Sequence, residues 1–307
     1  MKYLRYLKLI PFLVLLYVTA YYNNEITQYI IDNFIYYQEN IYLSEPNKYK
    51  LQNNFLYIQE TNNFYINNKK QLFNALYTIL NNGNNSFYFY CNYENCENDL
   101  DEISKNETLS IINNYVHPFN TYKKIYLTIN SQRKVEIVFD KTYTNEEIIS
   151  IENAIDIITN KIIADNMSDK EKIIAFHDYI INTTKYDSAY IENNLNDVSN
   201  LSHKATGVLF YNKALCGGYA DVMSIFLNKL NLPNYLISSE FHIWNAVYLD
   251  GNWYHLDLTW DDPVTNDGSD IRLEKFLLIS DDQLKSYNTG YHNYDETLYL
   301  EFNFTKR

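Results

Sequence analysis

Two strand-like segments joined by an Asp-Gly pair constrain this chain more than any other feature of its sequence. The segments are residues 241–249 and 252–258, and an Asp-Gly pair between such runs is typical of a two-residue β-hairpin turn. In that register His242 and Asp257 lie on the same face of the hairpin as diagonal neighbours, about 7–8 Å apart at the backbone. The sequence therefore predicts a hydrogen bond between their side chains, unless a bulge or an odd-length loop separates them.

A cysteine followed by two glycines is the second unusual feature. The chain has only seven glycines, and Gly217 and Gly218 follow Cys216 directly. Apolar residues then recur at helical spacing over residues 220–230, and Pro233 limits the helix. Cys216 is thus expected at a helix N-terminus, where free N–H groups favour a thiolate, with the small residues leaving room for a substrate backbone. From this feature alone, a buried structural cysteine is the alternative.

Two helix-start signals lie between residue 143 and Cys216. Thr144 with Glu147, and Ser168 with Glu171, are capping-box patterns that start helices. Isoleucines recur every three or four residues after the first cap, and apolar residues do so after the second. Each of the two helices is therefore expected to bury one face.

Three short segments carry a resemblance to a known family. They are Cys216–Ala220, His242–Asn245 and Trp253–Pro263. In sequence and order they resemble the Cys, His and Asp boxes of the transglutaminase-like superfamily, in its bacterial exported branch. The resemblance covers about residues 165–295. It implies an α+β fold with a papain-like core, in which a Cys-bearing helix packs on an antiparallel sheet.

The resemblance also implies roles for the residues in these boxes. Cys216 would be the nucleophile, His242 the general base and acid, and Asp257 the residue that orients His242. The thiolate would attack an amide carbonyl and form a thioester, which an amine resolves by transamidation and water resolves by hydrolysis. The oxyanion of the tetrahedral intermediate would be held by the Cys216 N–H, with Tyr211 as a candidate second donor. The residues expected to shape the substrate site are Gly217, Gly218, Tyr219, Trp244 and Asn245.

Two other functions remain open from the sequence. One is a surface binding or assembly module that keeps the fold without turnover, and the other is a cell-wall cysteine endopeptidase. No metal ion or cofactor is expected, because the acidic residues after Trp260 fit no Ca²⁺-loop template and predict a solvated turn. These acidic residues are Asp261, Asp262, Asp267 and Asp270, and the histidines expected to be structural are His177, His255 and His292.

The N-terminus and the cysteines suggest an exported protein. Residues 1–24 combine three early basic residues with a charge-free apolar run, which is typical of a signal peptide or an N-terminal membrane anchor. Cys91 and Cys96 are spaced to close a small disulfide loop in an oxidising compartment, with two unpaired thiols as the alternative. Cys216 would then be the free thiol.

Charge and composition limit the partners and outline the domains. The net charge of −13 opposes binding to nucleic acid, so a protein or peptide substrate outside the cytoplasm is expected. Residues 25–142 form an N-terminal α+β region of unassigned fold, with a hairpin predicted over residues 125–139. Residues 143–307 form the transglutaminase-like domain. The sequence does not indicate the oligomeric state.

Overall fold

The computed structural model describes residues 17, 40–105, 111–192, 200–263 and 271–304. Contacts divide the chain into two units, residues 1–42 and 43–307, and the elements named below belong to the second. The predicted leader, residues 1–24, lies outside the described residues except for Tyr17. Among the described helices, none is long and apolar enough to cross a membrane. The domain boundary expected after residue 142 lies inside the second unit. It stays a prediction.

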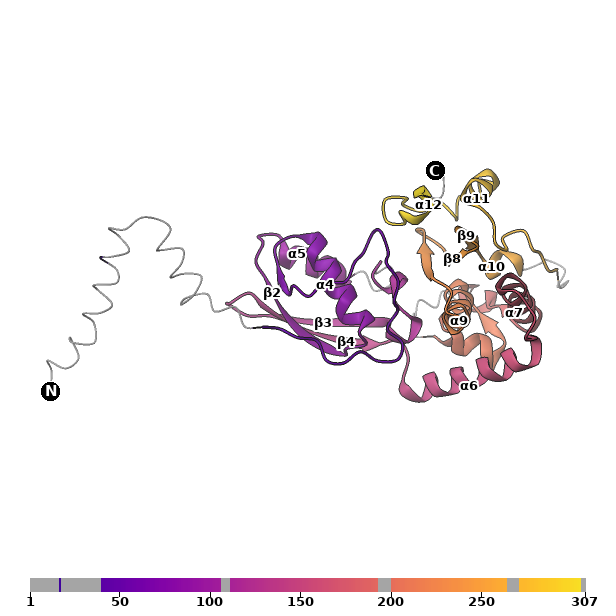
Figure 1. Cartoon of the computed structure of the whole chain (residues 1–307), viewed down its shortest axis with the longest axis horizontal. Coiled ribbons are helices and arrows are strands. Elements are labelled where there is room, and N and C mark those ends of the chain that lie inside the picture. Colours follow the sequence, from indigo (N-terminus) through magenta and orange to yellow (C-terminus); the bar gives the residue numbers. More distant parts are fainter. Residues whose placement is uncertain (1–16, 18–39, 106–110, 193–199, 264–270, 305–307) are drawn as a thin grey trace. The chain divides into compact units, whose positions relative to one another are not determined.

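A four-stranded sheet forms the first half of this unit. Its strands are β1 (Tyr65–Ile66), β2 (Ser86–Cys91), β3 (Tyr122–Ile129) and β4 (Lys134–Lys141), in the order β1-β2-β4-β3. β1 pairs with β2 in parallel, and the other pairs are antiparallel. The β3–β4 pair confirms the predicted hairpin. Helices α4 (Lys69–Asn81) and α5 (Cys96–Lys105) cover one side of the sheet (Figure 1).

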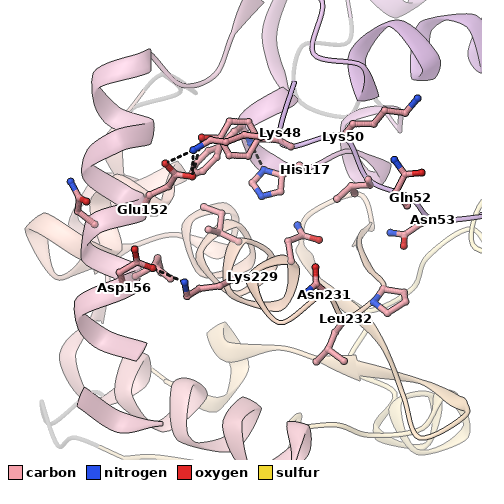
Figure 2. Close-up of a pocket in the computed structure, with 18 residues that line it drawn as sticks. Lys48, Lys50, Gln52, Asn53, His117, Glu152, Asp156, Lys229, Asn231 and Leu232 are labelled. Carbon is pink, nitrogen blue, oxygen red and sulfur yellow. Dashed lines mark hydrogen bonds and ion pairs between the residues drawn. The ribbon is translucent and has the colours of Figure 1, made fainter. Parts of the chain in front are cut away.

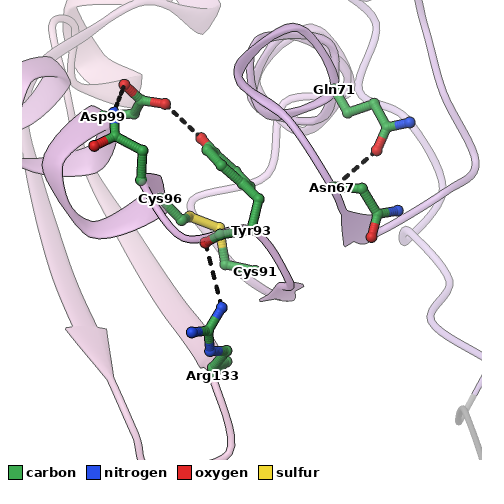
Figure 3. Close-up of a disulfide and its surroundings, with 8 residues drawn as sticks. Asn67, Gln71, Cys91, Tyr93, Cys96, Asp99 and Arg133 are labelled. Atoms are coloured by element: carbon green, nitrogen blue, oxygen red, sulfur yellow. Dashed lines mark hydrogen bonds between the residues drawn. A yellow bond between two sulfur atoms is a disulfide. The ribbon is translucent and has the colours of Figure 1, made fainter.

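A disulfide connects the end of β2 to the start of α5. Cys91 and Cys96 have Cα atoms 6.2 Å apart and both are buried. The loop between them is fixed by two further contacts (Figure 3): the Tyr93 hydroxyl donates to Asp99 at 2.7 Å, and Arg133 on the β3–β4 turn donates to the Tyr93 carbonyl at 3.3 Å. These contacts hold the short covalent loop against the sheet.

Two long helices follow, each with the predicted capping box. α6 (Asn145–Ile162) begins after Thr144, whose hydroxyl accepts the Glu147 N–H while the Glu147 carboxylate accepts the Thr144 N–H. α7 (Asp169–Thr183) begins after Ser168 in the same way. Each box satisfies two N–H groups that a helix start leaves free. The buried isoleucines of α6 and apolar residues of α7 join one hydrophobic core with α9 (Cys216–Lys229).

The second sheet contains the predicted hairpin. It consists of β7 (Asn234–Ser238), β8 (Ile243–Leu249) and β9 (Asn252–Leu256), all antiparallel. Asp250 and Gly251 both have positive φ, 50° and 85°, as a type I′ turn requires. The observed pair Leu249 and Asn252 confirms the predicted register. α9 packs against β7 and β8 (Figure 1), which confirms an α+β fold with the Cys-bearing helix on an antiparallel sheet.

Short elements complete the unit. β5 (Lys185–Tyr186) and β6 (Lys213–Ala214) form a parallel pair just before α9. The short α-helices are α8 (Ser188–Glu192), α10 (Leu258–Asp261), α11 (Asp281–Tyr287) and α12 (Glu301–Phe304). The short turns are η2 (Asn113–Tyr115), η3 (Pro118–Asn120), η4 (Leu201–His203) and the π-helical η5 (Gly207–Tyr211).

Candidate active site

Cys216 is the first residue of α9, and the glycines after it let this helix end approach a neighbouring turn. A Cβ atom on Gly218 would lie 2.6 Å from the carbonyl oxygen of Ser202, and one on Gly217 would lie 2.9 Å from that of His203. Both distances are far below van der Waals contact. The space beside the two glycines is therefore filled by the backbone of η4, which differs from the expectation that it is left open for a substrate.

His242 stands directly before β8 and faces the end of β9. Its carbonyl accepts the Ser239 N–H at 2.9 Å, so a tight turn fixes the backbone at this point. The His242 Nε2–H donates to Asp257 Oδ2 at 2.6 Å, and both residues are buried. The hairpin thus brings together the two side chains that its register predicts.

Asp257 is the most highly coordinated side chain of the site. It is the N-cap of α10, where Oδ1 accepts the backbone N–H groups of Thr259 at 2.9 Å and Trp260 at 3.3 Å. Oδ2 accepts from His242 and also from the Nε2–H of His292 at 2.8 Å. Four N–H groups therefore stabilise one buried carboxylate, which compensates for its removal from water.

His292 is a site residue that the sequence did not reveal. The sequence predicted a structural histidine, but its Nε2 contacts Asp257 and its Nδ1 lies 2.7 Å from the Thr289 hydroxyl. The ring packs edge-on against His242, with centroids 5.2 Å apart, and stacks on Phe276. His292 is 35 residues from Asp257 along the chain, so no local pattern could have paired them.

The charges of His242 and Asp257 reinforce each other. Burial alone would lower the pKa of His242, but the charge and hydrogen bond of Asp257, followed by the interaction with Cys216, raise it to about 10. Burial alone would raise the pKa of Asp257, but His242 and then His292 hold it below its usual range. His242 is therefore an imidazolium at neutral pH, paired with an ionised carboxylate.

Cys216 and Tyr186 complete the polar lining. Cys216 is partly exposed and is not in a disulfide, and it lies close enough to His242 to help raise the pKa of that ring. Because the Nε2 of His242 is hydrogen-bonded to Asp257, the Nδ1 of His242 is the nitrogen available to the thiol. β5 pairs Tyr186 with Ala214, two residues before Cys216, and burial followed by the nearby thiol raises the Tyr186 pKa to about 12. Its hydroxyl therefore keeps its proton at neutral pH.

Most residues expected to shape the substrate site have partners inside the protein. The Tyr219 hydroxyl donates to Asp262, the Trp244 Nε1–H donates to His255 at 3.0 Å, and the Asn245 amide donates to the Ala220 carbonyl at 2.9 Å. All three predicted residues are about 1% exposed. Trp244 also stacks on the His242 ring, with centroids 5.6 Å apart. Direct contact of these three residues, or of Gly217 and Gly218, with a substrate stays a prediction.

Tyr211 and the acidic residues lie differently from expectation. Tyr211 is 59% exposed at the end of η5, and its role as an oxyanion donor stays a prediction. The solvated turn predicted for the acidic residues is wrong for Asp261 and Asp262, which are buried. Asp261 accepts the Phe276 N–H at 2.9 Å and contacts His177 at 3.3 Å. Asp267 and Asp270 lie outside the described residues.

One group of side chains could in principle hold a metal ion. His242, Asp257 and His292 each offer a ligand atom, and these atoms lie within 4.8 Å of one another. However, the two His–Asp distances of 2.6 and 2.8 Å are hydrogen-bond lengths. Zinc held at about 2.0–2.2 Å by each ligand needs a wider separation between them. The observed contacts are those of a hydrogen-bonded network.

The fold places a cysteine at a helix N-terminus and a His–Asp pair at the ends of two neighbouring strands, as expected for a papain-like core. Residues 157–258, from α6 to the start of α10, match the family model for the transglutaminase-like superfamily. The chain therefore carries a transglutaminase-like domain, and the resemblance predicted from its sequence is confirmed.

Curated relatives and a solved structure each match about half of the chain. Kyphoscoliosis peptidase of Mus musculus is 24% identical over 183 residues, and that of Homo sapiens is 24% identical over 182 residues. Each match covers 54% of this chain and 25% of the relative, so the chain spans about a quarter of their length. A structure described as "Crystal structure of a TGase" is 19% identical over 54% of this chain and 58% of that chain, with a TM-score of 0.36.

The raised pKa of His242 predicts a pH-dependent contribution to stability. The folded-state pKa of about 10 lies above the ordinary value of 6.5. The His242–Asp257 pair therefore stabilises the fold fully below about pH 6.5 and loses its effect as pH rises towards 10. Asp257→Asn should lower the free energy of unfolding at pH 6.5, and the difference from wild type should shrink by at most about 1.4 kcal/mol per pH unit above it. A difference in denaturant unfolding that stays constant up to pH 10 would contradict this.

The hydrogen bond from His292 to Asp257 predicts a second effect. His292→Ala removes one donor from a buried carboxylate and should lower the free energy of unfolding by about 1.5–3 kcal/mol. His292→Gln, which keeps an N–H donor, should recover part of this loss. Urea unfolding of the three proteins near neutral pH measures both changes. Equal stability of the Ala and Gln variants would show that packing, and not the hydrogen bond, explains the contact.

Proposed function

We propose that this protein is a cysteine acyl-transfer enzyme that acts on amides of proteins or peptides. The observation that carries the proposal is the buried His242–Asp257 hydrogen bond, together with a His242 pKa that Asp257 and the nearby Cys216 raise. A thiol beside an imidazolium is readily converted to the thiolate, which is the nucleophilic form. A module that only binds would not need a partly exposed thiol in contact with a charged histidine.

The proposed reaction uses the Cys216 sulfur as nucleophile and the charged His242 as proton donor. The Cys216 thiolate attacks the carbonyl carbon of an amide, and the carbonyl electrons move to oxygen to form a tetrahedral oxyanion. His242 then donates its Nδ1 proton to the departing nitrogen, which leaves as ammonia or an amine, and a thioester remains. An amine or water attacks the thioester, neutral His242 takes a proton from it, and the product leaves Cys216. Asp257 stabilises the imidazolium that each cycle regenerates.

Two donors near Cys216 are suited to the oxyanion. The backbone N–H of Cys216 lies at the free end of α9, where the helix dipole also favours negative charge. The Tyr186 hydroxyl is the structural candidate for the second donor, because strand pairing places it beside Cys216 and it stays protonated. Tyr211, the candidate from sequence, is mostly exposed.

Activity on amides tests this function. The full chain is incubated with a glutamine-containing protein and a labelled primary amine to detect transamidation, while ammonia and new peptide termini are measured to detect hydrolysis. Wild type should show one of these activities, and Cys216→Ala should abolish it. His242→Ala and Asp257→Ala should reduce it by roughly 10³-fold or more. Wild-type turnover no greater than that of Cys216→Ala in every assay would contradict the proposal and favour a binding module.

A matched pair of tyrosine variants tests the oxyanion site in the same assays. Tyr186→Phe should lower the rate by about 10²-fold, as expected for loss of an oxyanion donor. Tyr211→Phe removes a hydroxyl of the same kind from the exposed end of η5 and should leave the rate close to wild type. The opposite order would favour Tyr211 as the donor.

We further propose that the protein acts outside the cytoplasm. The Cys91–Cys96 disulfide supports this, because such bonds persist in oxidising compartments and are rare in the cytosol. The charge pattern of residues 1–24 is consistent with export. Protein isolated from its source and alkylated under denaturing conditions should carry one label, on Cys216. Labelling of all three cysteines would contradict the proposal.

A further inference from the structure

A cavity far from Cys216 opens near the other end of α9. It has a volume of about 730 Å³ and is lined by the segment 48–53, by α6 and by the C-terminal part of α9 with the loop to Pro233 (Figure 2). Asn228, one of its lining residues, lies twelve residues after Cys216, which is about 18 Å along the helix axis. The volume falls within the range typical of small-molecule sites, about 300–1,000 Å³. The proposed reaction makes no use of this cavity.

The charged side chains of the cavity neutralise one another. Lys48 contacts Glu152 at 2.8 Å, and Lys229 contacts Asp156 at 2.6 Å; both pairs are visible in Figure 2. The remaining lysine, Lys50, contacts Glu60 outside the cavity at 3.0 Å. Each charge thus has a partner of opposite sign. An anionic or a cationic ligand would have to break one of these pairs, so the cavity suits a neutral ligand.

Amide side chains supply hydrogen-bonding capacity that the protein itself does not use. Four of them face the cavity without a hydrogen bond to another part of the described chain: Gln52, Asn53, Asn153 and Asn231. Each amide offers two donor hydrogens and a carbonyl acceptor at nearly the same point. Apolar side chains, among them Ile155, Ile225 and Leu232, line the same cavity. The lining therefore combines apolar side chains with paired donors and acceptors.

His117 adds a buried donor. The residue is 6% exposed, and its Nδ1 accepts the Phe119 N–H at 3.1 Å. Burial lowers the His117 pKa to about 3, so the ring is neutral and carries its single proton on Nε2. Within the described part of the chain nothing accepts that proton, and the ring lines the cavity (Figure 2). This Nε2–H lies at the cavity and is available to donate to a ligand oxygen.

We propose that this cavity binds a neutral sugar, as a short oligosaccharide or the end of a glycan. Sugar hydroxyls both donate and accept, as the free amides do. The C–H faces of a sugar ring match the apolar side chains of the lining. An extended peptide is less suited, because it binds by adding to a strand edge and none of the lining residues belongs to a strand. An amphipathic helix needs an apolar groove, which these amides and ion pairs do not provide.

The test uses the full chain with Cys216→Ala, so that binding is measured without turnover. Maltotriose and triacetylchitotriose are the sugar probes, and an acetylated, amidated Gly-Ser-Asn peptide is the neutral peptide probe. Calorimetry gives the dissociation constants, and NMR of the ¹⁵N-labelled protein follows the side-chain amide signals of Asn53 and Asn153. At least one sugar is expected to bind saturably and to shift these signals.

Matched asparagine variants locate the binding. Asn153→Ala combined with Asn53→Ala should weaken sugar binding by about tenfold or more, as loss of two hydrogen bonds predicts. Asn160→Ala changes another exposed asparagine of α6 that lies outside the cavity and should have no effect. Absence of saturable sugar binding, equal weakening by Asn160→Ala, or binding of the peptide alone would each overturn the proposal. Because the Cys216→Ala background has no nucleophile, these outcomes do not depend on the proposed reaction.

Discussion

The candidate site depends on one buried carboxylate. Asp257 ends the β8–β9 hairpin, begins α10 and accepts four N–H groups, two from the α10 backbone and two from imidazole rings. Each of these bonds is charge-assisted, and a buried carboxylate without them would be strongly unfavourable. The same residue therefore fixes the end of the sheet, the start of a helix and the orientation of His242.

A second constraint acts at the start of α9. Gly217 and Gly218 allow η4 to approach the helix backbone, and the Leu215 N–H donates to the Ser202 carbonyl at 2.7 Å. The parallel pair β5–β6 joins the same region and places Tyr186 near Cys216. Backbone packing, and not side-chain contacts alone, therefore sets the position of the thiol relative to the sheet.

The sequence predicted those parts of the site whose geometry is local. The Asp-Gly turn determines the hairpin register, and the register brings His242 to Asp257. The capping boxes and apolar spacing likewise determine where α6 and α7 begin and which faces they bury. Long-range contacts could not be predicted in this way. His292 reaches Asp257 through an irregular segment that includes Gly290 with a φ of +73°. The parallel β1–β2 pair and the β1-β2-β4-β3 order have no local signature either.

The burial of two carboxylates could not be predicted from the sequence either. Carboxylates in a run such as Asp261-Asp262 are usually solvated, yet the structure buries both and gives each a partner. The reason lies in groups distant in sequence, the Phe276 N–H for Asp261 and the Tyr219 hydroxyl for Asp262. Such partners are fixed only when the whole domain is assembled.

If His242 activates Cys216, the alkylation rate of this thiol depends on the histidine. Cys91 and Cys96 are joined in a disulfide, so iodoacetamide reports on Cys216 in the folded protein without any substrate. We expect fast alkylation at neutral pH in wild type and a rate at least tenfold lower in His242→Ala, because the imidazolium that favours the thiolate is lost. Equal rates in the two proteins would contradict it.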